Sequence, residues 1–187
     1  MPSITPALPR DAQAISRVHT KSWQHAYRGI FAADYLDGLD WRDRLAFWTN
    51  ELTDRPEGHV TLVARGGDSL LGFASAGPAR DADLATGFAE IYAIYVDPVS
   101  WCQGIGSSLL EASIDLLSTA GPGVEAVALW VLEANRQARS FYEARGFRPD
   151  GATAQVERGG VSAADLRYCR RLDTRLSPSP TRRGSLS

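Results

Sequence analysis

The sequence predicts a single α/β domain built on a mixed β-sheet of about six to seven strands, with helices on both faces. The chain has 187 residues, enough for one ordinary domain of this class, and its 44% hydrophobic and 22% charged residues are typical of globular proteins. The predicted elements follow in the order strand, helices, antiparallel hairpin, strand, helix, strand, helix, hairpin, which places parallel and antiparallel neighbours in one sheet. We expect the domain to span residues 1–174 and the Ser-, Pro- and Arg-rich residues 175–187 to form a disordered tail.

The N-terminal part of the chain predicts one short strand and two helical regions. Residues 4–7 form the strand, and Pro9 then begins a helix that ends near Ala26. The second helical region covers residues 34–50 and is broken near Gly38. Its apolar residues are expected to face a core, and they are Leu36, Leu39, Leu45, Phe47 and Trp48.

A β-hairpin and a further strand are predicted next. Residues 60–65 and 70–76 are two apolar runs joined by the turn sequence at residues 66–69, Gly-Gly-Asp-Ser. Phe88–Val96 is a run rich in Ile, Tyr and Val, which favours a buried strand.

The rest of the domain predicts a strand–helix–strand unit, a short helix and a last hairpin. A helix from Gly104 to about residue 120 leads into a strand at residues 124–131, which should lie parallel to the preceding strand. Residues 135–145 form a short helix closed by Gly146, and the hairpin follows from residue 148. The longer helix is expected to present one apolar face, made of Ile105, Leu109, Ala112 and Leu116.

Composition excludes several classes of function. The net charge of −2 provides no basic field for nucleic acid. The tail holds three of the 20 basic residues and no acidic ones, so the rest of the chain is acidic and suits a cationic substrate. Cys102 and Cys169 form no CxxC motif, and no Cys/His cluster indicates a metal. Because no signal peptide or apolar run of about 18 residues is present, we expect a cytoplasmic protein with no membrane partner.

The most informative segment is residues 91–106, IYAIYVDPVSWCQGIG. A strand runs into a turn with Gly104 and Gly106 and then into a helix, whose first backbone N–H groups have no intrahelical acceptor and can bind an anion. The segment lacks the third glycine of a dinucleotide fingerprint and the lysine of a P-loop. A pyrophosphate cradle at residues 103–107 and a purely structural turn are both open interpretations of this pattern.

A second pattern is NRQARSFYEARGF at residues 135–147. On a helix it places Ala138, Phe141 and Tyr142 at i, i+3 and i+4, with Asn135 on the same broad face. Together with the glycine turn one strand earlier, this sequence resembles the GNAT superfamily of acetyl-CoA-dependent N-acetyltransferases. The resemblance is specific over residues 90–147 and agrees in element order over residues 4–169.

The chain departs from the family pattern Q/R-x-x-G-x-G/A at two positions. The glycines correspond to Gly104 and Gly106, but the first position is Trp101, and Cys102 stands where glycine is common. The segment SWQHAYRGIF at residues 22–31 more weakly resembles a bacterial branch that includes polyamine acetyltransferases.

The resemblance implies a cleft for acetyl-CoA where the strands at Phe88–Val96 and 124–131 splay apart. Main-chain groups of the first strand would pair with the pantetheine, the glycine turn would bind the pyrophosphate, and Asn135 would contact the cofactor through its amide. The implied cofactor contacts are Ile94, Tyr95, Val96, Gln103, Gly104, Ile105, Gly106, Ser107, Asn135 and Tyr142.

The same resemblance and the chemistry of acyl transfer suggest roles for five side chains. Tyr142 is the candidate general acid at the thioester sulfur, and Glu90, inside an apolar stretch, is the candidate base or water relay. Trp23 and Tyr27, at i and i+4, and Tyr92 are candidates for binding the substrate amine, by cation–π contact in the case of the first two. The alternatives are structural: core packing for the aromatic residues and a solvated strand start for Glu90.

The direction of the side chains on the strand Phe88–Val96 depends on its regularity. Strict alternation places Glu90 and Tyr92 on the same face as Ile94 and Val96. A β-bulge, common in this strand of the family, would move the first pair to the opposite face from the second. Main-chain N–H groups near residues 94–96 would stabilise the oxyanion.

We therefore expect an N-acetyltransferase that transfers acetyl from acetyl-CoA to a primary amine of a small molecule by direct attack in a ternary complex, without a metal. One alternative is a protein or peptide N-terminal acetyltransferase. Another, of a different class, is a catalytically silent acyl-CoA-binding module. A homodimer is a family-level expectation only.

Overall fold

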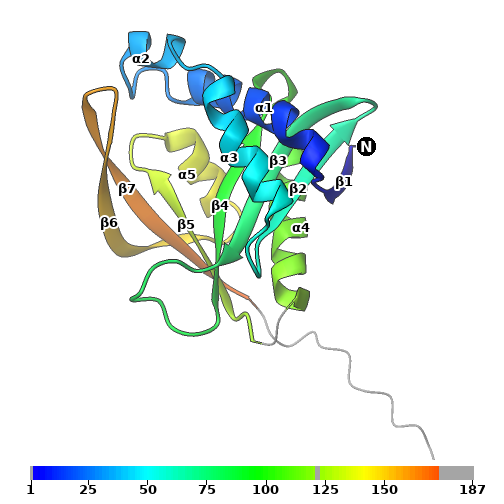
Figure 1. The fold of residues 1–187 in the computed structure, drawn as a ribbon. Coiled ribbons are helices and arrows are strands. Elements are labelled where there is room, and N and C mark those ends of the chain that lie inside the picture. The colour runs from blue at the N-terminus through cyan, green and yellow to red at the C-terminus, as the bar shows by residue number, and fades with distance from the viewer. Residues whose placement is uncertain (1, 121–122, 173–187) are drawn as a thin grey trace, which may run out of the picture.

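The computed structural model describes residues 2–120 and 123–172. It contains one seven-stranded mixed sheet with strand order β1-β2-β3-β4-β5-β7-β6 (Figure 1). All neighbours are antiparallel except β4 and β5, which confirms the parallel pair expected from the strand–helix–strand unit. The strands are β1 Ser3–Pro6, β2 Val60–Gly66, β3 Ser69–Pro78, β4 Phe88–Val96, β5 Ala126–Leu132, β6 Arg148–Arg158 and β7 Val161–Arg171.

Helices cover both faces of the sheet, as predicted. Helices α1 and α3 lie on one face of β2–β4, and α4 lies on the other (Figure 1). A single 3₁₀ turn, Pro9–Asp11, leads into the first helix, and another, Pro98–Ser100, follows β4. The helices are α1 Ala12–Ala26, α2 Ala33–Asp37, α3 Arg42–Thr53, α4 Ile105–Ala120 and α5 Arg136–Glu143.

The sheet opens in its middle. Strands β4 and β5 pair only from Phe88 with Ala126 to Ile91 with Leu129, although β4 continues to Val96. Beyond these pairs the two strands diverge, which confirms the predicted splay. A parallel pair that separates leaves main-chain groups of both strands without a sheet partner, and a ligand can use them.

A β-bulge lies just where the sheet opens. Ala76 of β3 pairs with Ile91, but the next residue of β3, Ser75, pairs with Ala93, so Tyr92 is the extra residue. As a result Ile91 and Ile94 both pack on the α4 side of the sheet. Of the two arrangements considered for this strand, the bulged one is therefore correct.

Two hydrophobic layers hold the helices to the sheet. On the α1 side Ile15, Trp48 and Phe73 are fully buried together. Phe47 is 58% exposed, so the prediction that it faces the core is wrong; its neighbour Trp48 occupies that side of α3. The buried face of α4 is also wider than predicted, because a flat sheet surface covers two rows of a helix: Leu110, Ser113, Ile114 and Leu117 are buried in addition to Ile105 and Leu109.

Residue 174, the predicted end of the domain, lies outside the described residues. The predicted tail at residues 175–187 lies outside the described residues. Within the described part, none of the helices combines the length and the apolar character that a membrane crossing needs.

Candidate active site

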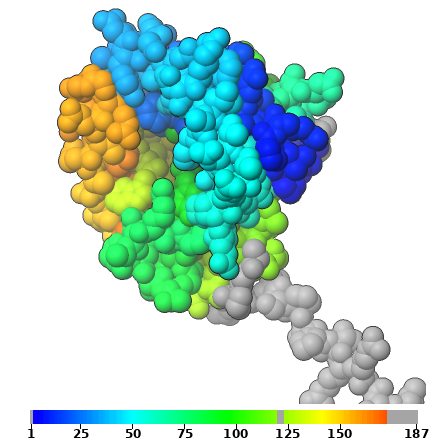
Figure 2. Space-filling model, viewed as in Figure 1, coloured from blue at the N-terminus to red at the C-terminus, as the bar shows by residue number. Residues whose placement is uncertain are grey.

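The open middle of the sheet forms a cleft of about 710 Å³. Figure 2 shows the molecule hollowed between the β6–β7 hairpin and the N-terminal helices. Residues from α1, β4, the start of α4, α5 and the β6–β7 hairpin line the cleft. It collects almost all residues predicted for the site: Trp23, Tyr27, Tyr92, Ile94, Tyr95, Val96, Gly104, Ile105, Gly106, Ser107, Asn135 and Tyr142; Glu90 and Gln103 do not line it.

One end of the cleft is the N-terminus of α4. Its first intrahelical hydrogen bond runs from Ser108 N to Gly104 O at 3.0 Å, so the N–H groups of Ile105, Gly106 and Ser107 have no acceptor within the helix. Gly104 adopts a φ of +79°, which turns the chain so that these groups face the cleft. Converging N–H groups at the start of a 16-residue helix fit the phosphates of a nucleotide cofactor.

The turn itself holds one strained residue. Cys102 has a φ of 61° and is the one non-glycine residue in the left-handed region among residues 2–120 and 123–172. Glycine adopts this conformation without cost, which gives a physical reason for glycine at this position in the family pattern.

Helix α5 approaches the same end closely and brings a cation. A Cβ on Gly106 would lie 3.4 Å from the ring of Phe141, an ordinary van der Waals distance, so the first turn of α4 lies next to α5. The guanidinium of Arg145 lies over the same ring, 3.8 Å from its centre, and donates a hydrogen bond to Ser107 Oγ. Arg145 lines the cleft and was not singled out from the sequence; it lies in the turn just after α5, where it also donates a hydrogen bond to the carbonyl of Phe141 at 2.7 Å.

Trp101 does not replace the missing basic residue of the family pattern. Its indole Nε1 donates to the carbonyl of Val96 at 2.8 Å, and Ser22 Oγ of α1 donates to the same oxygen at 2.9 Å. Two donors occupy both lone pairs of this carbonyl, so of the Val96 main chain only the N–H is left for a cofactor. Ser22 therefore ties α1 to the end of β4, and Trp101 binds the same end of β4 while its ring packs against His25 of α1.

Tyr142 lies in the wall of the cleft on α5. It packs against Phe141 and Phe147, and no residue of the described part of the chain hydrogen-bonds to its hydroxyl. Burial raises the pKa of Tyr142, and the nearby Tyr95 raises it further, so the phenol stays protonated and can donate. Asn135 caps α5 by accepting from Ala138 N at 3.1 Å through Oδ1, which leaves its amide N–H₂ available.

The other end of the cleft has aromatic walls. Trp23 Nε1 donates to the hydroxyl of Tyr95 at 2.9 Å, and the hydroxyls of Tyr27 and Tyr95 lie 3.4 Å apart. Burial raises the pKa of both Tyr27 and Tyr95. These residues both pack with neighbouring rings and face the cleft, so the structural and the substrate-binding interpretations of Trp23 and Tyr27 are compatible.

Glu90 is not free. It is only 2% exposed, and Oε2 accepts from the backbone N–H of Arg80 at 3.0 Å and from its Nε at 3.1 Å, while Oε1 accepts from Nη2. The carboxylate is buried, as its apolar surroundings indicated, but it does not line the cleft, and a role for Glu90 as base or water relay remains a prediction that requires this ion pair to open. Arg80 also covers the ring of Tyr92, whose pKa is raised to about 12 by burial and by the charge of Glu90.

Asp165 of β7 is a cleft residue that the sequence reasoning missed. It is the single carboxylate among the described residues that line the cleft, and it forms no hydrogen bond or ion pair with any of them. Burial raises the pKa of Asp165, and Arg158 partly opposes this. The sequence offered no signal beyond a polar residue in a hairpin strand.

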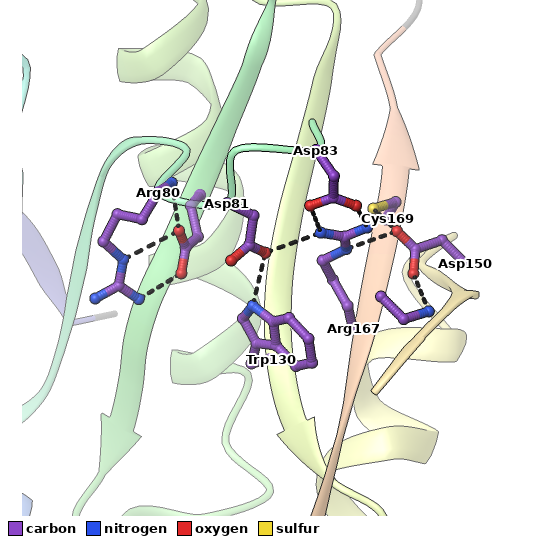
Figure 3. Close-up of polar contacts among 9 residues, drawn as sticks. Arg80, Asp81, Asp83, Trp130, Asp150, Arg167 and Cys169 are labelled. Carbon is purple, nitrogen blue, oxygen red and sulfur yellow. Dashed lines mark hydrogen bonds and ion pairs between the residues drawn. The ribbon is translucent and has the colours of Figure 1, made fainter. Parts of the chain in front are cut away.

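A charged cluster beside the cleft fixes the loop between β3 and β4. Arg167 of β7 is 5% exposed and pairs with Asp81 at 3.0 Å, Asp83 at 2.6 Å and Asp150 at 2.7 Å (Figure 3). Asp81 in turn accepts from the indole of Trp130, a cleft residue, at 2.9 Å. Within the described ranges no group of three or more His, Cys, Asp or Glu side chains could hold a metal ion.

Comparisons with known proteins agree with this geometry. The model of the acetyltransferase (GNAT) family matches residues 20–147. The uncharacterised N-acetyltransferase YuaI of Bacillus subtilis is 31% identical over 77% of this chain and 79% of its own length. The fold is similar to that of the PaiA N-acetyltransferase of Thermoplasma acidophilum in complex with coenzyme A, with a TM-score of 0.70 and 19% identity over 92% of this chain and 99% of the other. It is also similar to YncA of Salmonella typhimurium with its cofactor acetyl-CoA, with a TM-score of 0.68 and 23% identity over 95% and 97%.

Proposed function

Because the chain belongs to the acetyltransferase (GNAT) family, it is an acetyl-CoA-dependent N-acetyltransferase, and we propose that it acetylates a primary amine of a small molecule by direct attack in a ternary complex. One observation carries the proposal: a single cleft has free N–H groups for phosphates at one end and a walled aromatic pocket at the other. Both reactants can then be held together, which lowers the entropic cost of the reaction.

The shape of the acceptor end supports a small molecule rather than a peptide. The β6–β7 hairpin packs against the segment around α2, where Phe31, Leu36 and Leu132 are buried together. At the tip of the hairpin, a Cβ on Gly159 would lie 2.4 Å from Tyr35, so the two walls are in close contact. An extended peptide would need an open groove at this place.

The residues at the other end suit acetyl-CoA, which supplies the acetyl group as a thioester when it is bound. We assign the pyrophosphate to the N–H groups of residues 104–107, with Arg145 as an additional cation. The main chain of Ile94 and the N–H of Val96 would hold the pantetheine arm, beside the side chain of Tyr95, whose main-chain groups pair with Phe73 of β3. The amide of Asn135 would also contact this arm. Gln103 lies outside the cleft lining and contributes at most its backbone N–H.

Each chemical role then falls to a residue of the cleft. Tyr142 donates a proton to the leaving sulfur. Its raised pKa keeps the hydroxyl protonated, so that this proton is present when the sulfur leaves. Trp23, Tyr27 and Tyr92 line the place of the amine, and the ring faces of Trp23 and Tyr27 favour a cation. Main-chain N–H groups near residues 94–96 stabilise the negative charge on the carbonyl oxygen.

The substitution Tyr142→Phe tests the general acid. We expect kcat to fall by about 100-fold or more, since positioned acids contribute on that scale, while the dissociation constant of acetyl-CoA stays unchanged. Free-thiol release measures kcat, and calorimetry measures binding. Tyr35→Phe is a matched control, because Tyr35 lies outside the cleft lining and should change neither value. An unchanged kcat in Tyr142→Phe would remove this residue from the mechanism.

The choice of acceptor is tested with the wild-type enzyme. Polyamines, amino acids, aminoglycosides and short peptides are screened for thiol release in the presence of acetyl-CoA. Turnover with small amines supports the proposal, and turnover confined to peptides supports an N-terminal acetyltransferase instead. Binding of acetyl-CoA without turnover of any amine would favour the silent module, and absence of binding at millimolar acetyl-CoA would contradict the assignment of the cleft.

A further inference from the structure

We propose that Asp165 is the anionic anchor and general base of the acceptor site, so that the enzyme selects amines that are cationic ammonium ions in solution. This inference rests on the proposed small-amine acetyltransferase function. It assigns to a residue of β7 the proton transfer for which Glu90 was the candidate.

Among the described residues that line the cleft, Asp165 is the one carboxylate, and it has no hydrogen-bond or ion-pair partner. Glu90 is bound on both oxygens by Arg80, and Asp81, Asp83 and Asp150 share Arg167. None of the described residues pairs with Asp165, although it is half-buried and lines the cleft. A partly buried carboxylate without a partner costs stability, so a ligand that supplies the partner gains a strong interaction.

Asp165 borders the acceptor end of the cleft, because its strand neighbour Leu132 is buried with Phe31 and Leu36. On β7 it pairs with Leu132 of β5 on one side and Ala154 of β6 on the other. Its charge raises the pKa of the hydroxyls of Tyr27 and Tyr95, so it lies near both. The charge of Tyr142 also raises the pKa of Tyr27. Tyr27 therefore lies near both the proposed base, Asp165, and the proposed acid, Tyr142.

Three charged or titratable groups interact electrostatically with Asp165. They are Tyr27 of α1, Tyr95 of β4 and Arg158 of β6. The positive charge of Arg158 partly offsets the rise that burial causes in the pKa of Asp165, but Arg158 stays beyond ion-pair distance. An ammonium ion held against Asp165 would also lie among the rings of Trp23 and Tyr27, and these two kinds of contact favour the same ligand charge.

The proton balance of the reaction is complete with these residues. Asp165 takes one proton from the ammonium ion and later returns it to solvent. The lone pair thus freed on nitrogen forms the C–N bond to the acetyl carbon as the C–S bond breaks. Tyr142 gives its proton to the sulfur and is reprotonated by the second proton that leaves the nitrogen.

The test compares Asp165→Asn with Asp115→Asn, a control that removes the same charge from an exposed site on α4. Benzylamine, cationic at neutral pH, and aniline, which is neutral, serve as matched probes that fit an aromatic pocket. Calorimetry of each probe on the enzyme–CoA complex should show benzylamine weakened at least tenfold by Asp165→Asn, with aniline and acetyl-CoA unchanged. The variant should unfold at the same temperature as wild type or higher at pH 7, which separates this loss from misfolding.

Kinetics with the best acceptor from the amine screen separate the base from the anchor. Asp165→Asn should remove the acidic limb from the pH profile of kcat/KM, whereas Glu90→Gln should retain it. If Asp165→Asn keeps wild-type benzylamine affinity, or if wild type binds no benzylamine, Asp165 is not the anchor. Loss of the acidic limb in Glu90→Gln alone would return the role of base to Glu90. A wild type that acetylates no amine would instead overturn the proposed function, and this inference with it.

Discussion

Arg145 supplies a positive charge at the N-terminus of α4, where the family pattern would place a basic or amide residue and this chain has Trp101. We expect Arg145→Ala to raise the dissociation constant of acetyl-CoA by about tenfold, because a charge-assisted hydrogen bond to a phosphate contributes about 1.5–3 kcal/mol. Calorimetric titration measures the change. Arg171→Ala, at an exposed position at the end of β7, is the control, and equal affinities in the two variants would exclude Arg145 from the cofactor site.

Single residues were predictable where a motif carried them. Gly104, Asn135 and Tyr142 belong to spaced patterns, and all three lie in the cleft. Asp165 was not predictable, because its significance arises from the absence of a partner, and partners are a property of the folded molecule. The same holds for the ion pair of Glu90. The apolar residues around Glu90 correctly indicated its burial, but nothing in the sequence indicated that Arg80, ten residues earlier on a loop, would pair with it.

Ion pairs hold the loop at residues 79–87 in place. Arg167 joins Asp81 and Asp83 of this loop to Asp150 at the start of β6, and Asp81 also holds the indole of Trp130. The wall of the cleft formed by Trp130 therefore depends on a contact between segments distant in sequence.

Replacing Arg167 should release the loop. We expect Arg167→Met to lower the free energy of unfolding by about 3 kcal/mol, since it leaves carboxylates without their buried partner. Asp83→Asn removes one exposed member of the cluster and should cost less than about 1 kcal/mol. Urea denaturation followed by tryptophan fluorescence measures both. An Arg167→Met enzyme as stable as Asp83→Asn would show that the cluster does not hold the loop.

Elements were the best predicted level of structure. The bounds of β4 follow directly from its apolar run, and the hairpin turn at residues 66–69 is where its glycines indicated. Less was predictable about orientation. The bulge at Tyr92 depends on pairing with β3, and the exposure of Phe47 depends on which side of α3 meets the sheet.

At the scale of the whole molecule, acid should weaken the fold through His19. This side chain accepts a hydrogen bond from Trp48 Nε1 at 3.2 Å and stacks on Tyr95, and burial, assisted by the charge of Arg44, lowers its pKa to about 3. The unfolded chain binds a proton at this residue below pH of about 6.5, and the folded chain does not. The contribution of His19 to the free energy of unfolding is therefore complete above a pH of about 6.5. It is lost as the pH falls toward 3, by about 1.4 kcal/mol per pH unit.

The variant His19→Gln keeps a hydrogen-bond acceptor and removes the titration. Thermal unfolding between pH 7 and 4 should show a clearly smaller decrease in Tm for this variant than for wild type. His25→Gln, at a histidine near Trp101, is the matched control for replacing a histidine by glutamine. Asp165 has the opposite effect on stability in acid, because its raised pKa favours protonation in the folded state. The comparison of wild type with His19→Gln is therefore repeated in the Asp165→Asn background, where this effect is absent. Parallel curves for His19→Gln and wild type would contradict the prediction.

The two ends of the cleft come from different parts of the chain. The cofactor end is built within residues 91–145, inside the segment shared with the family. The acceptor end combines the turn after α1 with the β6–β7 hairpin, which begins just after that segment. Substitutions near the tip of the hairpin, away from the contacts of Tyr168 with α5, should therefore change the acceptor end and leave the cofactor end as it is. In evolutionary terms, an enzyme of this design can acquire a new acceptor by changing its outer segments while it inherits the same donor machinery.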